Sequence, residues 1–318
     1  MRRISLSFLH KETSVIALGT DGFGVSRSPE AAEELLDCYV SAGGNVIDTA
    51  RMYGRPEIGE YGICESVTGA WMAKRGNRVD LVISTKGGYP GMNGKPRLDR
   101  ASLTGDVQAS LDALQTDFID IYWLHRDDPQ RPVADIIDTL NGMIDRGWVG
   151  SIGASNWTAQ RIREANDYAA AHGMHGFEGT QPQWSLARQV VNPDPTLVIM
   201  GDDLFHLQME RNMLCMPFSA QAKGYFAKLI GGGEEALSPK ARARFHFPEN
   251  IAIAERLRTL CAEYGCAPAA MSLAWLTNQP FATVPIISAR NPEQLLESLA
   301  AGDIVLMDDQ RDGLRVMR

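Results

Sequence analysis

The chain carries the segment NVIDTARMYG at residues 45–54, where a short apolar run meets a polar turn. The run Asn45 to Ile47 is of the kind that predicts a buried strand. Asp48 follows it directly, and Tyr53 comes five residues later. A carboxylate and a phenol at the end of a strand are groups that can hold and transfer protons.

Two other apolar runs end on a polar side chain in the same way. Residues 81–85 precede Lys86, and residues 118–124 precede His125. If the ends of the three runs converge in space, their carboxylate, phenol, ammonium and imidazole groups form one proton-transfer site.

Short β-type runs alternate with amphipathic helical patterns along the whole chain. Strands are predicted at 15–18, 45–47, 81–85, 119–124, 149–153, 177–182, 213–217 and 283–287. Helices are predicted from Ser28-Pro29 to Gly43 and at 57–75, 102–115, 133–146, 158–172, 201–211, 249–264, 268–278 and 292–300. Strands that alternate with helices indicate parallel βαβ units. Eight such units predict an α/β fold, a (β/α)8 TIM-type barrel, which takes about 250 residues plus insertions.

A doubly wound sheet is the alternative architecture. It normally carries a glycine-rich phosphate turn after its first strand, and residues 19–24 have the wrong spacing for one. No stretch rich in proline, glycine or serine marks a boundary, so residues 1–318 are expected to form a single barrel domain. Glycine-rich connections at 87–94 and 223–248 follow strands, which predicts long loops on the C-terminal face. The second connection is alternatively a surface insertion.

Composition is that of a soluble globular protein, with 44% hydrophobic and 22% charged residues. The net charge of −8 argues against a nucleic-acid partner. No apolar run approaches the roughly 18 residues of a spanning helix, so no membrane partner is expected. Five cysteines without CxxC spacing indicate thiols in a reducing compartment. The expected location is cytoplasmic, because the apolar stretch after Arg3 is too short for a signal peptide.

Five segments, taken in order, carry a resemblance to a known family. They are DTARMYG at 48–54, GICESVTG at 62–69, IDIYWLH at 119–125, GWVGSIGASNW at 147–157 and PIISARN at 285–291. Over nearly the full length, the chain resembles the aldo-keto reductase superfamily, although Cys64 stands where serine is more usual. The resemblance implies a TIM-type barrel that binds an extended NADPH molecule without a Rossmann domain.

The resemblance also implies a catalytic set, which consists of Asp48, Tyr53, Lys86 and His125. A phenol has a pKa of about 10 and donates a proton poorly near neutral pH, and a nearby ammonium lowers that pKa. Lys86 is the expected cation, held in place by Asp48. His125 is expected to orient the carbonyl oxygen of the substrate. Tyr53 is then the general acid in carbonyl reduction and the general base in the reverse reaction.

Cofactor-binding residues follow from the resemblance, position by position. The nicotinamide end is assigned to Ser155, Asn156, Gln183 and Trp184, the last of which is alternatively a core aromatic residue. The pyrophosphate path is assigned to Phe218, Ser219, Gln221 and Gly224. The adenosine end is assigned to Ser288, Arg290, Gln294 and Ser298, and Gly22 also belongs to the cofactor set. Because the planar fork of arginine suits a phosphate, Arg290 favours NADPH over NADH.

Substrate contacts are expected from residues around the mouth of the barrel, namely Phe23, Tyr89, Trp123 and Arg126. Trp184, Phe226 and Phe247 are further aromatic candidates there. Arg126 alternatively pairs with Asp127 or Asp128. An aromatic mouth suits small aldehydes and the faces of sugar rings, so the predicted substrate is a sugar or another small aldehyde.

Other functions stay open at this point. The enzyme can instead run as a dehydrogenase that oxidises a sugar, and a broad aldehyde reductase is a close alternative. A regulatory subunit that senses the cofactor without catalysis is a second class, which turnover with carbonyls would exclude. A metal-dependent barrel enzyme is a third, but tyrosine and lysine are not a metal-ligand set.

Overall fold

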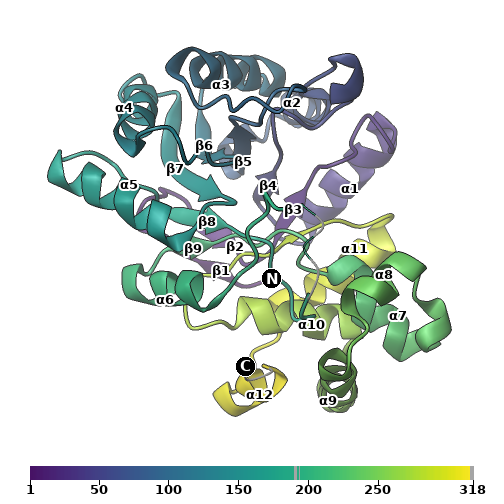
Figure 1. Ribbon diagram of the computed structural model, residues 1–318. Helices are drawn as coiled ribbons and strands as arrows, with labels where there is room; N and C mark the ends of the chain where they lie inside the picture. Colours follow the sequence, from purple (N-terminus) through teal and green to yellow (C-terminus); the bar gives the residue numbers. More distant parts are fainter. Residues whose placement is uncertain (190–191, 193, 316–318) are drawn as a thin grey trace.

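The computed structural model describes residues 1–189, 192 and 194–315, and its centre is a barrel of parallel strands (Figure 1). The strands are β3 (Ala17–Gly19), β4 (Val46–Asp48), β5 (Val82–Gly87), β6 (Ile119–Leu124), β7 (Val149–Ser155), β8 (Gly179–Gln181), β9 (Leu214–Cys215) and β10 (Ile286–Ile287). The segment that leads into β10 closes the barrel. The main-chain nitrogen of Val284 donates to the oxygen of Cys215 at 2.8 Å, and that of Ala17 donates to the oxygen of Pro285 at 3.0 Å.

Helices surround the strands (Figure 1). After β3 to β8 in turn come α1 (Pro29–Ser41), α2 (Ile63–Arg75), α3 (Arg100–Leu114), α4 (Val133–Ile144), α5 (Ala159–Ala171) and α6 (Asp202–Arg211). After β9 come α7 (Tyr225–Gly232), α8 (Pro239–Phe245), α9 (Pro248–Tyr264) and α10 (Pro268–Thr277). After β10 come α11 (Pro292–Leu299) and α12 (Asp308–Leu314). The predicted (β/α)8 TIM-type barrel is confirmed, because each crossover carries at least one helix.

Side chains on alternate strand positions fill the barrel interior. One buried cluster contains Val82, Ile121, Trp123 and Leu214, which come from β5, β6 and β9. Successive residues of a strand point to opposite faces, so Lys86 lies on the same side of β5 as Val82. The interior is therefore apolar where the strands begin and becomes polar at the C-terminal rim, the edge where the strands end.

An antiparallel hairpin of β1 (Arg3–Ile4) and β2 (Thr13–Ser14) precedes the barrel. Its connection carries Leu6, which packs in the interior cluster, with Phe8 and Leu9 against the same cluster. The hairpin thus covers the end of the barrel at which the strands begin. Sequence patterns did not predict it, because two-residue strands are too short to show an alternation of apolar and polar residues.

The connection at 223–248 was predicted to be a long loop, but part of it is helical. It contains the two short helices α7 and α8. Its local signals explain this, since the Ser238 side chain caps α8 and Pro239 takes the first helical position. No helix within the described residues is long and apolar enough to cross a membrane.

Candidate active site

A buried ion pair lies at the C-terminal rim. Asp48 is the last residue of β4, and its Oδ2 lies 2.5 Å from Nζ of Lys86 on β5. The two side chains are only 2% and 3% exposed. Lys86 also donates to the main-chain oxygen of Thr49 at 2.6 Å. Asp48 and Tyr53 raise the pKa of Lys86 although burial opposes the charge, so the ammonium is held in its charged form.

Two further side chains hold Asp48 from its other oxygen. Ser84 Oγ donates to Oδ1 at 2.8 Å, and Gln181 Nε2 donates to the same atom at 2.9 Å. Trp123 Nε1 in turn donates to Ser84 Oγ at 2.7 Å. The sequence interpretation missed Ser84 and Gln181. Strand alternation was the available signal, because Ser84 precedes Lys86 by two positions and so faces the same side.

Tyr53 lies next to this pair. Lys86 Nζ is 5.0 Å from the centre of the Tyr53 ring, and the His125 ring stands edge-on at 6.0 Å. Burial raises the pKa of Tyr53 to about 12, and the charge of Lys86 opposes that rise. The expectation of a lowered pKa is therefore corrected: the ammonium acts in the expected direction, but burial outweighs it. The phenol stays protonated at neutral pH.

His125 follows β6 and completes the four-residue cluster. Burial, together with the charges of Lys86 and Arg126, holds the pKa of His125 well below its usual value. The imidazole is therefore neutral, and its Nδ1 has no hydrogen-bond partner among the described residues. The ring of Tyr89 packs on it edge-on at 4.9 Å. The four predicted catalytic side chains thus come together at one rim.

This neutral histidine predicts a pH effect on stability. An unfolded histidine binds a proton below about pH 6.5, whereas the folded His125 resists one, so stability falls as the pH drops below that value. The expected extra loss is about 1.4 kcal/mol per pH unit. Denaturant unfolding at pH 7 and pH 5 should show this loss in the wild type and not in His125→Gln. The exposed His172→Gln is the matched control, and parallel curves for all three proteins would contradict the prediction.

The expected substrate residues divide into two groups. Tyr89 and Arg126 stand beside His125, with the Arg126 guanidinium 5.1 Å from the centre of the Tyr89 ring. Phe23 and Trp123 are almost fully buried at 1% and 0% exposure. Trp123 lies beneath the ion pair, where its indole supports Ser84. Of these four residues, only Tyr89 is half-buried rather than buried.

Arg126 does not pair with Asp127 or Asp128, the alternative predicted from the sequence. Its Nε donates to Thr196 Oγ1 at 3.0 Å, and its NH2 lies 3.8 Å from Asp194. Asp127 instead pairs with Arg161 at 3.2 Å.

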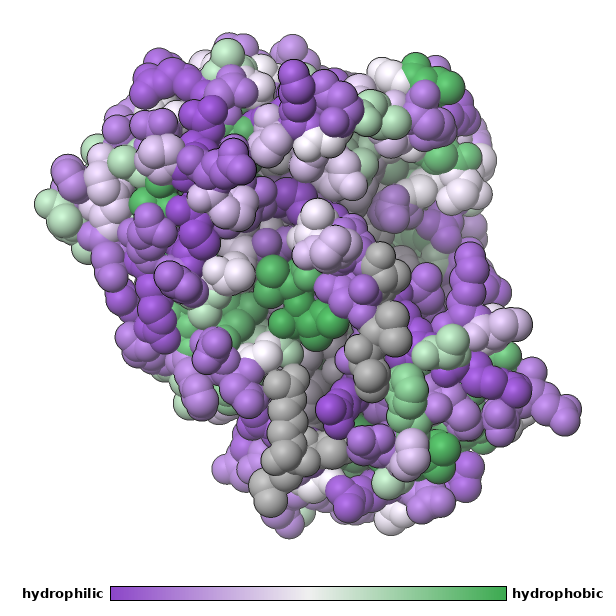
Figure 2. Space-filling view, viewed as in Figure 1, coloured by the Kyte–Doolittle hydropathy of each residue, from purple (hydrophilic) through white to green (hydrophobic). Residues whose placement is uncertain are grey.

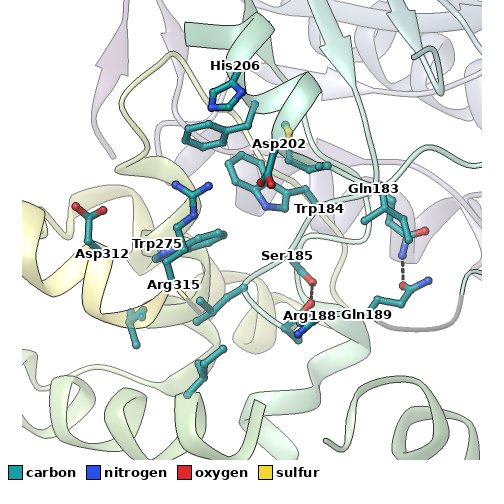
Figure 3. Close-up of a pocket in the computed structure, with 18 residues that line it drawn as sticks. Gln183, Trp184, Ser185, Arg188, Gln189, Asp202, His206, Trp275, Asp312 and Arg315 are labelled. Atoms are coloured by element: carbon teal, nitrogen blue, oxygen red, sulfur yellow. Dashed lines mark hydrogen bonds between the residues drawn. The ribbon is translucent and has the colours of Figure 1, made fainter. Parts of the chain in front are cut away.

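Ser155 and Asn156 end β7 beside His125. Asn156 has a positive φ of 61°, a left-handed conformation that asparagine adopts more readily than most residues. Its Nδ2 donates to Ser155 Oγ at 3.0 Å and to the main-chain oxygen of His125 at 3.3 Å. Gln183 bonds to Gln189 through its amide nitrogen (Figure 3). The assigned nicotinamide-end residues Ser155 and Asn156 are therefore adjacent to the catalytic cluster.

Trp184 lies in a different environment. Its ring contacts those of Phe205, Trp275 and Phe281, with the Trp275 ring at 5.3 Å. No ring contact among the described residues joins it to Tyr53 or His125. It lines a cavity of about 610 Å³ together with Gln183, Trp275 and Arg315 (Figure 3), where the Arg315 guanidinium lies 4.5 Å from the centre of the Phe205 ring. Trp184 is partly buried and lines this cavity, so its assignment to the nicotinamide end stays a prediction.

Backbone strain concentrates after β9. Ser219, Ala222 and Lys223 have positive φ values of 55°, 47° and 56°, and Gly224 follows at 73°. Non-glycine residues in this region cost of order 1–3 kcal/mol each and cluster at ligand clamps. Three of the residues assigned to the pyrophosphate path, Ser219, Gln221 and Gly224, fall in this segment, and Phe218 precedes it.

Hydrogen bonds connect the residues assigned to the adenosine end. Gln221 Nε2 donates to Ser298 Oγ at 3.0 Å, and Gln221 Oε1 accepts from the main-chain nitrogen of Ser288 at 3.3 Å. Gln294 Oε1 accepts from the main-chain nitrogen of Arg290 at 2.8 Å. The strained segment and the loop after β10 are thus linked by hydrogen bonds.

Gly22, also assigned to the cofactor, has a φ of 93° in the turn after β3.

The polar groups at the rim fit a nicotinamide dinucleotide. The Oε1 atoms of Gln181 and Gln183 are buried acceptors that have no donor among the described residues. An amide NH2 group supplies the donor that such atoms lack. At the other end, the exposed Arg290 offers a guanidinium to a phosphate. Within the described residues, no group of His, Cys, Asp and Glu side chains could hold a metal ion.

Known proteins resemble the chain over most of its length. A model of the aldo/keto reductase family matches residues 15–315. The putative aryl-alcohol dehydrogenase AAD14 of Saccharomyces cerevisiae is 30% identical over 91% of this chain and 77% of its own. Norsolorinic acid reductase B of Aspergillus parasiticus is 28% identical, over 93% of this chain and 78% of its own. Protein tas of Escherichia coli is 27% identical, over 94% of this chain and 92% of its own.

Proposed function

The chain belongs to the aldo/keto reductase family, and from this premise we propose that it reduces a carbonyl compound to an alcohol with NADPH. The observation that carries the proposal is the convergence of a buried Asp48–Lys86 pair with Tyr53 and His125. A bound NADPH supplies the hydride for the carbonyl carbon. The residues of the chain supply the proton and the alignment.

Each residue of the cluster has a role that its environment supports. Tyr53 donates its phenolic proton to the oxygen of the carbonyl as the alcohol forms. Lys86 stabilises the phenolate that remains, and Asp48 keeps the ammonium charged and in place. The neutral His125 donates one hydrogen bond to the same carbonyl oxygen and thereby orients the substrate.

The protonation state of Tyr53 supports reduction as the main direction. With its pKa raised to about 12, Tyr53 is in the protonated form that reduction needs at neutral pH, whereas alcohol oxidation needs the phenolate as a base. Reduction is therefore expected to be favoured at neutral pH and oxidation at alkaline pH. Initial rates in both directions across this range would test the assignment.

For the substrate we propose a small aldehyde, with sugar aldehydes and aryl aldehydes as the two classes to compare. The ring of Tyr89 beside His125 suits stacking on either class. A relative named as a putative aryl-alcohol dehydrogenase supports an aromatic carbonyl. Turnover on a panel of both classes, followed by NADPH fluorescence, tests the proposal. Tight NADPH binding without turnover on any carbonyl would instead favour a regulatory role.

Arg290 is expected to determine the preference for NADPH. Arg290→Ala should weaken NADPH binding about ten- to a hundredfold, because a charge-assisted hydrogen bond is worth about 1.5–3 kcal/mol. NADH lacks the 2′-phosphate and should be nearly unaffected. Fluorescence titration with both nucleotides measures this difference. Equal losses for the two nucleotides would contradict the role of Arg290 at the 2′-phosphate.

We also propose that residues 1–318 act as a single barrel domain in the cytoplasm. The five cysteines are all free thiols, which agrees with a reducing compartment.

A further inference from the structure

Arg27 lies where two loops of the rim meet. It belongs to the connection between β3 and α1, and its NH2 donates to the main-chain oxygen of Ala289 at 2.6 Å. Because β3 and β10 are neighbours in the barrel, the connections that follow them are neighbours too. Ala289 stands between Ser288 and Arg290, the residues assigned to the phosphate of the adenosine end. Arg27 therefore contacts the loop that carries these two assigned residues.

The guanidinium of Arg27 is fixed before any ligand arrives. Its Cζ lies 5.4 Å from the centre of the buried Phe23 ring. The main-chain nitrogen of Gly24 donates to the oxygen of Arg27 at 2.7 Å, which closes the turn that starts at Gly22. A planar fork held in this way loses little freedom when it binds a phosphate.

The charge of Arg27 has no counterpart in the described part of the chain. Two other half-buried arginines near the rim are matched by carboxylates: Arg51 pairs with Glu65, and Arg97 pairs with Asp106. No ion pair among the described residues includes Arg27, and the carbonyl oxygen that it contacts is uncharged. Burial lowers the pKa of Arg27, so its surroundings disfavour the cation. A partly buried charge of this kind indicates an anionic partner from outside the chain.

We propose that Arg27 binds a phosphate group of the dinucleotide, so that Arg27 and Arg290 hold it from two loops. This inference rests on the proposed function, because it requires a dinucleotide along the rim. The phosphate comes either from the 2′ position of the adenosine or from the pyrophosphate. Both sources share the chemistry that a guanidinium recognises, and the two nucleotides distinguish them.

The test uses Arg27→Gln and Arg27→Lys in the full chain, with dissociation constants for NADPH and NADH from fluorescence titration in the absence of substrate. Arg27→Gln is expected to weaken NADPH binding about ten- to a hundredfold. Arg27→Lys keeps the charge and should recover part of the loss. Arg256→Gln is the matched control, because Arg256 also donates to a main-chain oxygen, that of Gly313 at 2.6 Å, far from this path in the chain.

The outcomes separate the alternatives. A loss for NADPH alone supports contact with the 2′-phosphate, and equal losses for both nucleotides support contact with the pyrophosphate. Unchanged affinities in Arg27→Gln, while Arg290→Ala binds weakly, would overturn the inference and leave the proposed function intact. An equal loss in Arg27→Gln and Arg27→Lys, with a lowered melting temperature in both, would overturn it in favour of a structural role. A wild-type protein that binds neither nucleotide would overturn the proposed function itself.

Discussion

Tyr53→Phe is expected to lower kcat by about 10²–10⁴-fold, the usual contribution of a positioned general acid. The variant loses one oxygen and keeps the ring, so its packing with His125 should persist. NADPH binding should be unchanged, because Tyr53 is not among the residues assigned to the cofactor. Steady-state turnover with an aldehyde and NADPH titration together measure the two effects.

Tyr39→Phe is not a suitable control for Tyr53→Phe, since the Tyr39 hydroxyl is buried and bonds to four main-chain or side-chain groups. Tyr264→Phe is the better control, because Tyr264 lies on α9 and bonds to Gln310. Its turnover should match that of the wild type. Near-normal turnover in Tyr53→Phe would remove the phenol from the proposed mechanism.

Lys86→Met has the largest expected effect on stability. The substitution leaves the 2%-exposed carboxylate of Asp48 without its cation, and breaking a buried pair in this way costs about 3–5 kcal/mol. Turnover should also collapse, because no ammonium is left to stabilise the phenolate of Tyr53. Denaturant unfolding measures the first effect and steady-state kinetics the second.

The double variant Asp48→Asn/Lys86→Met distinguishes the effect of the unpaired charge on stability from the loss of catalysis. It removes both charges, and Asn can still accept from Ser84 or Gln181. Stability should therefore return most of the way to the wild-type value, whereas turnover should stay low. If the double variant regained activity as well, the pair would be a structural feature and not part of the proton-transfer site.

The barrel and the catalytic cluster were predictable because their signals are local. Asp48, Lys86 and His125 each follow an apolar run, and parallel strands bring such ends to one edge. The strand at 119–124 was predicted with the bounds that the structure has. Strands of a closed parallel barrel are buried on both faces, so they read as continuous apolar runs that are easy to recognise.

Other parts of the site depend on contacts between distant residues. Gln181 reaches Asp48 across 133 positions of sequence, and no local pattern predicts that hydrogen bond. The raised pKa of Tyr53 results from burial by the whole rim, whereas the sequence suggested only the neighbouring charge. Arg27 has no local sequence signal either, because its hydrogen bond to Ala289 joins positions 262 residues apart.

The hairpin that covers one end of the barrel has a consequence for how this scaffold can diversify. Leu6 and its neighbours pack in the barrel interior at the end away from the catalytic cluster. Residues that stabilise this end of the barrel are therefore separate from those that would bind ligands. The connections at the C-terminal rim are then free to vary in length and composition without loosening the interior. This separation offers a physical reason why relatives that are 30% and 28% identical to this chain carry names with different substrates.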